Sequence, residues 1–369
     1  MYRYVLIADY PAPWREKVYE IVHRSLGDEF HVVYCTRKEE RRLWKFPLGN
    51  HPKTFLKVIT LGAKDNERFF SPGIVPFLLK HRPEVLIGFS LHPTVLAGFV
   101  TGRLLRSKSI VFSDTWLGRD RSISRLQKLA RRFVYHRFAD AFIGASEQTL
   151  RLFKHYRPDV PNDSMFISSL CADNDYFRQC LEGREDDRKY DIVFSGRIAA
   201  EKNPLFFAEV ACRLRTRLGS CRALILGDGD GNLKQAMLRK LADGGVDYDF
   251  PGFVEHARLP YYYSKGKVLL MPTSGDCWGV VLNEAMVCGL PVVTTEWTAA
   301  VGELVRDAHN GYVLPLDSAF WADRIASLLT DGTRWQKFSE NAMESVRNFT
   351  FEAAAGGILE AITLLENHQ

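Results

Sequence analysis

The sequence predicts an α/β protein with two doubly wound domains, on two observations. Short apolar runs rich in β-branched residues alternate with helical stretches along the whole chain, without the strict polar alternation of half-exposed strands. Such runs indicate parallel strands that are buried on both faces. The chain of 369 residues is also too long for one ordinary hydrophobic core, so two domains are expected.

The expected strands fall into two sets on either side of a polar segment. They are the runs at 4–9, 31–35, 57–61, 85–89, 109–113 and 141–145 in the first half, and at 191–195, 222–226, 267–272 and 291–295 in the second. The segment CLEGREDDRKYD, residues 180–191, is polar and charged, which suits a linker. We therefore divide the chain into domains at 1–180 and 181–349, followed by a terminal segment at 350–369.

Composition is that of a soluble globular protein, with 46% hydrophobic and 25% charged residues. No run approaches the roughly 18 apolar residues that span a bilayer, and MYRYVLIADYPAP lacks the features of a signal peptide, so a cytoplasmic location is expected. The seven cysteines form no CxxC pair and are expected to be reduced, without disulfides or structural zinc.

Charge is divided unevenly along the chain. Residues 1–150 contain 25 Lys and Arg against 14 Asp and Glu, a net +11, while residues 151–369 contain 24 against 30, a net −6, and these sum to the +5 of the whole chain. The basic surplus therefore belongs to the N-terminal half, which predicts an anionic partner there.

The stretch SGRIAAEKNP follows an expected strand and opens a helix. Asn203 is expected as the helix N-cap, with Pro204 at the first helical position. Gly196 lets the backbone turn tightly, and Arg197 and Lys202 lie in the loop at the carboxyl end of the strand, where open α/β sheets bind ligands. Two cations there suit a phosphate, although a solvated loop with two ordinary surface charges explains the same residues.

The stretch SGDCWGVVLNEAMVCGLP predicts a loop and then a helix that begins near Gly279 and ends at Gly289. Free amides at a helix N-terminus favour a diphosphate, and glycine permits its close approach. Asp276 in the loop and Glu284 in the helix could then hold neutral hydroxyls on either side of the diphosphate. The alternative is that Asp276 caps the loop and Glu284 is a solvated helix residue.

Four motifs in order resemble the C-terminal domain of the retaining glycosyltransferase family 4, the glycosyltransferase group 1 enzymes. They are GRIAAEKNP, LILGDGDGN, the run DFPGFVEHARLPYYYSKGKVLLMPTSGDCWGVVLNEAMVCGLPVV, and HNGYVLPLD, and they cover about residues 190–316. The resemblance implies the GT-B fold, two Rossmann-like domains that face each other across a cleft, with the acceptor bound by 1–180 and the donor by 181–349. It also implies that residues 350–369 form a helix that packs back toward the N-terminal domain.

The resemblance implies a role for each residue of the donor site. Arg197 and Lys202 would bind the donor diphosphate, and Glu284 would hold the nucleotide ribose. The base would lie against Gly252, Phe253 and Val254, and the donor sugar and phosphates would meet Gly196, Asp276, Trp278, Gly279, Val280 and Val281. Asp276 stands where the family usually has a glutamate. Trp278 stands where it usually has a phenylalanine, and its indole would either pack inside the domain or stack on the sugar.

The N-terminal half resembles the family more loosely, through PEVLIGFSLHPTVLAGF, SIVFSDTWLGRD and DAFIGASEQT. Asp114 stands where members often carry a histidine, and it could orient or deprotonate an acceptor hydroxyl or serve as a cap. The further candidates for the acceptor pocket are Trp14, Arg15, His92 and Trp116.

The stretch RDRSISRLQKLARRFVYHRF, residues 119–138, carries seven Lys or Arg, and Ile123, Leu126, Ala130 and Phe133 repeat along one face. A basic amphipathic helix is typical of binding to an anionic membrane surface, as in relatives that extend lipid-linked glycans. A core-packed helix with a solvated basic face is the alternative. No nucleic-acid recognition motif accompanies the charge, so nucleic acid is not expected as a partner.

The resemblance predicts a retaining, metal-independent transferase that moves a sugar from a nucleoside-diphosphate sugar to a hydroxyl acceptor, a glycan or lipid-linked glycan in surface polysaccharide synthesis. The nucleotide sugar is a co-substrate, and no cofactor or metal is expected. Asp228-Gly229-Asp230 matches the Asp-x-Asp pattern of metal-dependent transferases, but two other such triplets occur and turn chemistry explains them. A nucleotide-sugar 2-epimerase of the same fold and a non-catalytic sugar-nucleotide-binding subunit remain alternatives.

Overall fold

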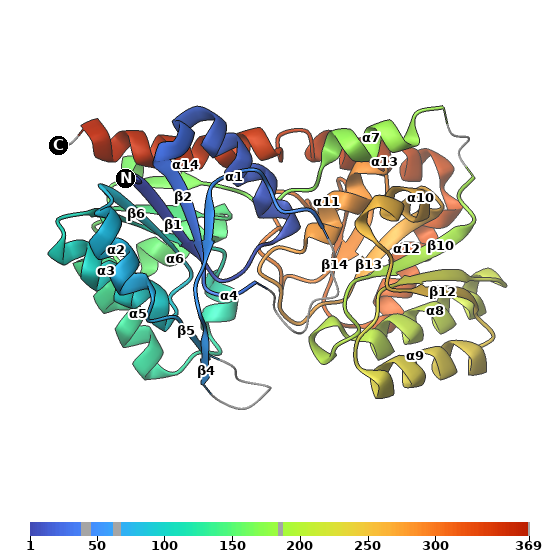
Figure 1. Cartoon of the computed structure of the whole chain (residues 1–369). Helices are drawn as coiled ribbons and strands as arrows, with labels where there is room; N and C mark the ends of the chain where they lie inside the picture. The colour runs from blue at the N-terminus through green and yellow to red at the C-terminus, as the bar shows by residue number, and fades with distance from the viewer. Residues whose placement is uncertain (38–45, 62–67, 184–186, 368–369) are drawn as a thin grey trace. The chain divides into compact units, whose positions relative to one another are not determined.

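The computed structural model describes residues 1–37, 46–61, 68–183 and 187–367, and the contacts divide the chain into two compact units (Figure 1). The first unit consists of Met1–Leu170 with Phe351–Gln369, and the second of Cys171–Thr350. Each unit is built on a parallel sheet with alternating helices, which confirms the two doubly wound, Rossmann-like domains. Residues 184–186 of the expected linker lie outside the described residues.

The sheet of the first unit has seven parallel strands in the order β3-β2-β1-β6-β7-β8-β9. These strands are β1 (Tyr4–Ala8), β2 (Phe30–Tyr34), β3 (Lys53–Phe55), β6 (Val85–Phe89), β7 (Lys108–Ser113), β8 (Ala141–Gly144) and β9 (Met165–Ile167). The helices of the unit are α1 (Pro13–Leu26), α2 (Ile74–His81), α3 (Pro93–Leu104), α4 (Leu117–Asp120), α5 (Arg125–Arg137), α6 (Glu147–Tyr156) and α14 (Phe351–Asn367), with short 3-10 turns at Gly27–Glu29 and Asn162–Ser164. Strand β1 pairs with β2 on one side and with β6 on the other. The strand order therefore reverses at β1, which makes this the switch point of the sheet, the place where open α/β sheets bind ligands.

Helix α14 belongs to the first unit although it is the last helix of the chain. It packs against α1 and β9. A Cβ on Gly357 would lie 1.8 Å from the carbonyl oxygen of Ile167, so a glycine is needed where the helix backbone meets the end of β9. The last helix is therefore held by the N-terminal unit.

The sheet of the second unit has six parallel strands in the order β12-β11-β10-β13-β14-β15. These strands are β10 (Tyr190–Ser195), β11 (Arg222–Leu226), β12 (Asp247–Gly252), β13 (Gly266–Met271), β14 (Val292–Thr294) and β15 (Gly311–Val313). The helices are α7 (Asn174–Leu181), α8 (Pro204–Leu218), α9 (Gly231–Asp243), α10 (Leu259–Tyr263), α11 (Val280–Val287), α12 (Ser318–Thr330) and α13 (Gly332–Ser345), and the 3-10 turns are η3 (Ala200–Lys202) and η4 (His256–Arg258). The switch point of this sheet lies at β10, between β11 and β13.

Two sequence expectations about the elements differ from the structure. The run at 57–61 contributes β4 (Ile59–Leu61), which pairs antiparallel with β5 (Arg68–Phe70) outside the main sheet. The stretch 119–138 forms two helices, because Ser124 starts α5 with a capping box, accepting from the Gln127 amide while the Gln127 side chain accepts from the Ser124 amide. Within the described residues, we find no helix with the length and apolar character that a bilayer span requires.

Candidate functional site

Two loops of the second unit pack backbone against backbone where β10 and β11 end. Gly227 has a φ of +138°, and a Cβ there would lie 1.9 Å from the carbonyl oxygen of Gly196. A Cβ on Gly229 would lie 2.2 Å from the carbonyl oxygen of Ile198, which accepts from the Asp230 amide at 2.8 Å. The glycines of LILGDGDGN therefore allow the close contact that fixes the turn at the end of β10.

The acidic triplet in the same motif has turn and capping roles, as the sequence predicts. Asp230 caps α9, accepting from the Asn232 and Leu233 amides at 2.9 Å each. Asp228 pairs with Lys234 at 2.8 Å, and this bond is the main cause that lowers the pKa of its carboxyl. Both acids are thus engaged in local structure.

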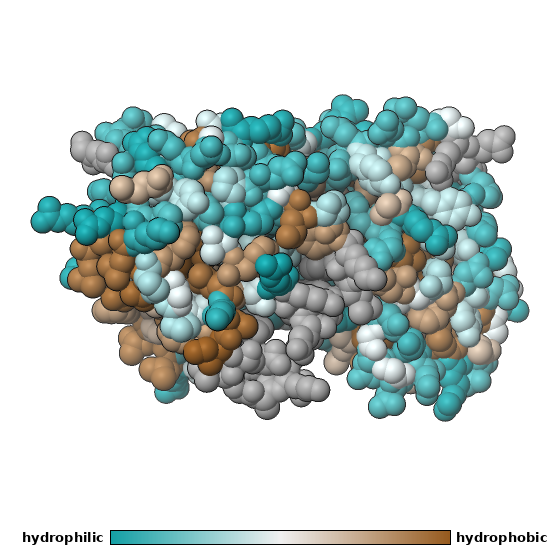
Figure 2. Space-filling model, in the orientation of Figure 1, coloured by the Kyte–Doolittle hydropathy of each residue, from teal (hydrophilic) through white to brown (hydrophobic). Residues whose placement is uncertain are grey.

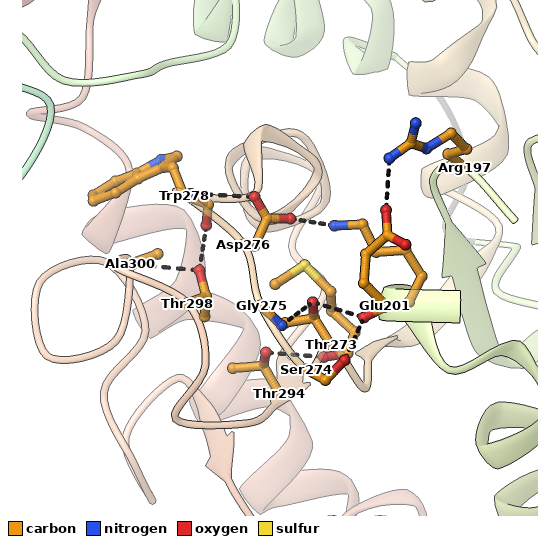
Figure 3. A network of polar contacts seen from close by, with 12 residues as sticks. Arg197, Glu201, Thr273, Ser274, Gly275, Asp276, Trp278, Thr294, Thr298 and Ala300 are labelled. Carbon is orange, nitrogen blue, oxygen red and sulfur yellow. Dashed lines mark hydrogen bonds and ion pairs between the residues drawn. The ribbon is translucent and has the colours of Figure 1, made fainter. Parts of the chain in front are cut away.

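The two predicted diphosphate cations are each paired with a carboxylate in the structure (Figure 3). Arg197 donates to Glu201 at 2.6 Å, and both side chains are more than a third exposed, at 37% and 39%. Lys202 pairs with Asp276, and each of these side chains is 19% exposed. Sequence reasoning gave Lys202 and Asp276 separate ligands, whereas the structure brings them into contact. A diphosphate bound here would replace these two carboxylates as the partner of Arg197 and Lys202.

Hydrogen bonds tie the loop after β13 to η3, so the two cation-bearing segments form one framework (Figure 3). The carbonyl oxygen of Glu201 accepts from the Ser274 amide at 2.9 Å and from the Thr273 hydroxyl at 3.1 Å. Asn203 is the N-cap residue of α8, as predicted, with Pro204 at the first helical position, but its side chain makes no capping hydrogen bond. Its φ is +48°, and its amide group donates across the loop to the Pro272 carbonyl at 2.7 Å.

Helix α11 begins at the predicted place. Gly279 occupies its N-cap position with a φ of +86°, and a Cβ there would come within 3.0 Å of the Met271 side chain. Among the described residues no side chain caps this helix, and the amides of its first two residues, Val280 and Val281, have no acceptor within the helix. Such an end is favourable for an anion. Asp276 lies beside it, because its carboxylate accepts from the Trp278 amide at 3.2 Å.

The Trp278 side chain is a core group. It is fully buried, its indole N–H donates to Asn283 at 2.8 Å, and its ring lies 5.4 Å from that of Phe349. Thr298 holds its backbone by donating to the Trp278 carbonyl at 2.5 Å (Figure 3). Of the two roles considered for this indole, packing inside the domain is the one the structure has, and stacking on a sugar is ruled out by its burial.

Glu284 lies in α11 and is almost buried. It accepts from the Tyr263 hydroxyl at 3.0 Å, which in turn lies 2.7 Å from the Ser195 hydroxyl, and His256 lies 3.9 Å away. Burial raises the pKa of the Glu284 carboxyl, with His256 and Tyr263 acting in the opposite direction. The alternative of a solvated helix residue is therefore wrong: Glu284 belongs to a polar network at the carboxyl end of β10.

The residues predicted to meet the base follow β12 directly. Gly252 ends the strand with a φ of +76°, and its carbonyl accepts from the Gly227 amide at 2.8 Å. Phe253 and Val254 come next and are half-buried. This short segment is thereby fixed to the glycine-bearing loop after β11, on the same sheet edge as Gly196.

In the first unit, Asp114 follows β7 and is half-buried. Burial raises the pKa of its carboxyl, with Arg15 acting in the opposite direction. Arg15 is only 4% exposed and donates twice to the Ser168 carbonyl, at 3.1 Å each, which argues against its predicted contact with an acceptor. Trp116 is 8% exposed and Trp14 is half-buried, so neither indole ring is exposed to the extent of an aromatic side chain on the surface.

His92 has a partner that sequence reasoning missed. It precedes α3, and its Nε2 lies 2.6 Å from the Asp9 carboxylate, which follows β1. Burial disfavours the charged imidazole, but the bonds to Asp9 and to Cys35 outweigh it and raise the pKa of His92 to about 10. Asp9 could have been found as the acid at the carboxyl end of the expected strand at 4–9, since that position lies on the ligand side of the sheet.

The fold is shared with solved glycosyltransferases. The chain superposes on Anabaena HepE in complex with UDP with a TM-score of 0.76 at 15% identity, covering 99% of this chain and 100% of that one. It superposes on WaaG, a glycosyltransferase involved in lipopolysaccharide biosynthesis, with a TM-score of 0.66 at 15% identity, covering 98% and 99%. The fold is thus that of the two-domain GT-B structures.

Residues 189–331, most of the second unit, match the family model described as "Glycosyl transferases group 1". The segment that carries the sequence motifs is 32% identical over 161 residues to the alpha-D-kanosaminyltransferase of Streptomyces kanamyceticus, covering 42% of this chain and 40% of that protein. It is 35% identical over 178 residues to the D-inositol 3-phosphate glycosyltransferase of Xylanimonas cellulosilytica, covering 46% and 41%. The chain therefore spans about two fifths of the length of these curated relatives.

Proposed function

We propose that the protein is a retaining glycosyltransferase that moves a sugar from a nucleoside-diphosphate sugar to a hydroxyl acceptor. The observation that carries the proposal is the convergence of Lys202, its partner Asp276 and the uncapped start of α11 at one switch point. A leaving diphosphate needs positive charge and free donors fixed in advance, and this place offers both. Neither a metal ion nor a cofactor is required for that task, with the nucleotide sugar acting as co-substrate.

The remaining donor contacts follow from the same sheet edge. Arg197 would take the second phosphate by exchanging with Glu201, and Glu284 would accept from the ribose hydroxyls. The base would lie against Gly252, Phe253 and Val254. Asp276 would accept from a donor-sugar hydroxyl once the diphosphate has taken its place beside Lys202.

The first unit would hold the acceptor, with Asp114 as the polar group that meets its hydroxyls. Among the matched proteins, one from Campylobacter jejuni is named for transfer to an undecaprenol-linked glycan and shares 24% identity over 177 residues, covering 48% of each chain. This similarity supports a glycan or lipid-linked glycan in surface polysaccharide synthesis as the acceptor class.

Removing the two cations tests the proposal. We expect Arg197→Ala and Lys202→Ala each to lower turnover by about 10²- to 10³-fold, by analogy with the loss of an oxyanion donor. Lys234→Ala is the matched control, since Lys234 pairs with a loop acid of the same unit. Unchanged transfer rates in both variants would overturn the assignment.

A donor-turnover assay separates the alternatives. A transferase without acceptor slowly releases nucleoside diphosphate, whereas a non-catalytic subunit binds the nucleotide sugar saturably without turnover. A 2-epimerase would instead invert the configuration at C2 of the sugar and return the epimeric nucleotide sugar.

We also propose that the first unit docks on an anionic membrane surface through residues 119–138, which would place a cytoplasmic protein at the inner face of the cell membrane. Two side chains of the predicted apolar face, Leu126 and Phe133, point outward on α5 and are 75% and 60% exposed, and Leu129 on the same helix is 64% exposed. Figure 2 shows a hydrophobic area where Figure 1 draws α3 and α5. A core-packed helix with a solvated basic face does not account for such exposure.

Basic side chains lie on the same helix as these apolar residues, and one of them, Arg131, forms an ion pair that holds the helix to the unit. Arg131 is 14% exposed and turned inward to Asp120, which also accepts from the Tyr156 hydroxyl at 2.6 Å. Arg125 and Arg132 are exposed on the same helix. Arginine around an apolar stripe suits anionic headgroups above an acyl boundary.

Co-sedimentation with vesicles tests the docking. We expect the protein to bind vesicles that contain phosphatidylglycerol, with binding that falls as salt rises, and we expect Leu126→Gln with Phe133→Gln to abolish it. Leu205→Gln is the matched control, because Leu205 is 40% exposed on the second unit. Equal binding by both variants, or no salt-sensitive binding by the wild type, would contradict the proposal.

A further inference from the structure

The described part of the chain contains one group of three residues whose side-chain atoms could share a metal ion: Asp9, Cys35 and His92. The His92 Nε2 lies 2.6 Å from an Asp9 oxygen and 3.9 Å from the Cys35 sulfur. All three ligand atoms lie within 4.8 Å of one another. These residues belong to the first unit and take no part in the donor site described above.

The topology brings the three together at the switch point of the first sheet. Asp9 follows β1, Cys35 follows β2, and His92 precedes α3 in the connection after β6. The Cys35 amide donates to the Ala8 carbonyl at 3.0 Å, which holds the ends of β1 and β2 level. Pro93 at the first position of α3 fixes the backbone beside His92. The donors thus stand on three backbone segments that the sheet holds in place.

The donor set selects the kind of ion. One thiolate sulfur, one imidazole nitrogen and one carboxylate oxygen are the ligands of tetrahedral Zn²⁺, and Co²⁺ can replace it in such sites. Ca²⁺ and Mg²⁺ prefer oxygen ligands only. Three protein ligands would leave a fourth position for water or a substrate oxygen.

We propose that Asp9, Cys35 and His92 bind a zinc ion on the acceptor-side unit, a site beyond the proposed sugar transfer. Ligand bonds of about 2.0 to 2.3 Å place tetrahedral donors roughly 3.3 to 3.8 Å apart. The 3.9 Å between the His92 and Cys35 atoms is slightly longer than this range, so these two atoms would have to approach each other a little, and the Asp9 oxygen would have to withdraw from His92. The Asp9 side chain is 27% exposed and free to move outward, whereas Cys35 is fully buried. On binding, the Cys35 thiol becomes a thiolate and the protonated His92 imidazole loses its Nε2 proton, and both protons pass to the solvent.

The second ring nitrogen of His92, Nδ1, is the feature in which this site differs from common zinc sites. Among the described residues, the buried His92 Nδ1 has no hydrogen-bond partner, whereas a zinc-bound imidazole usually donates from that nitrogen. We therefore expect an affinity about 10- to 100-fold lower than that of a site whose histidine has such a partner.

Cobalt titration of the full-length protein, stripped with a chelator, tests the proposal without any reliance on activity. We expect one equivalent of Co²⁺ to produce intense tetrahedral ligand-field bands and a thiolate-to-cobalt charge-transfer band, and Zn²⁺ to displace it. Cys35→Ser should remove the charge-transfer band, and His92→Gln should weaken binding at least about tenfold. Cys277→Ser is the control, since Cys277 lies in the second unit and is half-buried.

Thermal melting of each variant without metal shows whether it is folded. If a variant at Cys35 melts early, Asp9→Asn with wild-type cysteines provides a second test, because it should weaken cobalt binding while keeping the charge-transfer band. Absence of that band in the folded wild type, or a band that Cys35→Ser leaves unchanged, would overturn the proposal.

Discussion

Replacing Gly227 by alanine tests whether close packing of two loops sets the position of the diphosphate cations. The added Cβ would lie 1.9 Å from the Gly196 carbonyl oxygen, a backbone atom that cannot rotate away, and the φ of +138° is one that alanine rarely adopts. Overpacking and backbone strain together should lower the free energy of unfolding by roughly 2 to 5 kcal/mol. The loop that carries Arg197 must shift to relieve the clash.

Gly231→Ala is the matched control, because its Cβ would meet open space at the first position of α9. Alanine there should leave the free energy of unfolding unchanged or raise it by up to about 1 kcal/mol. Urea unfolding gives this quantity, and calorimetric titration with UDP, GDP, ADP and TDP gives nucleotide affinity. We expect Gly227→Ala to lose at least about tenfold in affinity for the preferred nucleotide. Equal unfolding free energy and equal affinity in the two variants would refute the reasoning.

Three further predictions concern the second unit. Because burial raises the pKa of Glu284, the folded state holds that proton more tightly than the unfolded state. The free energy of unfolding should therefore fall as pH rises from the ordinary glutamate pKa to the raised one. Urea unfolding at several pH values should show a smaller fall in Glu284→Gln than in the wild type, because other carboxyls with a raised pKa, such as Asp114, remain in the variant. Trp278→Phe removes the indole bond to Asn283 and should lower the free energy of unfolding by about 1 to 3 kcal/mol while leaving the donor KM unchanged, and a large rise in KM would contradict the packing role. Lys202→Met should weaken binding of a nucleoside diphosphate more than that of the nucleoside, which a direct titration of both ligands can show, and equal losses would indicate that Lys202 does not meet the phosphates.

Sequence patterns were sufficient to predict the strands of both sheets near their switch points and the residue at which α11 begins. Gly279 could be placed because a glycine just before an amphipathic run, with a second glycine at its end, is typical of a short helix between two turns, and both Gly279 and Gly289 have positive φ. The cation-bearing loop after β10 followed from the same logic. These features depend on neighbours in the chain, which a sequence displays directly.

Pairings between distant segments could not be predicted in the same way. Lys202 and Asp276 are 74 positions apart, and only the packing of β10 beside β13 brings their loops together. The burial of Trp278 depends on Asn283 and on Phe349 beyond α13, so its own position in a loop gave no sign of it. Asn203 has the residue type of a cap, but its left-handed backbone and the nearby Pro272 carbonyl decide its bond.

Some misses had signals that were present in the sequence. The Ser124 and Gln127 spacing is that of a capping box, and it divides the stretch 119–138 where the structure divides it. The run at 57–61 is β-branched, yet the backbone there pairs in an antiparallel ribbon with β5, a partner that its composition does not specify.

The central claim is that a leaving diphosphate binds between the Lys202 side chain and the first amides of α11. A crystal structure of the protein with its preferred nucleoside diphosphate measures this directly. The account predicts a phosphate oxygen within hydrogen-bond distance of the Lys202 ammonium and of the amides of Val280 or Val281, with the bond from Lys202 to Asp276 broken or shared. A diphosphate bound away from this end of the helix, with the Lys202 and Asp276 pair intact, would contradict it.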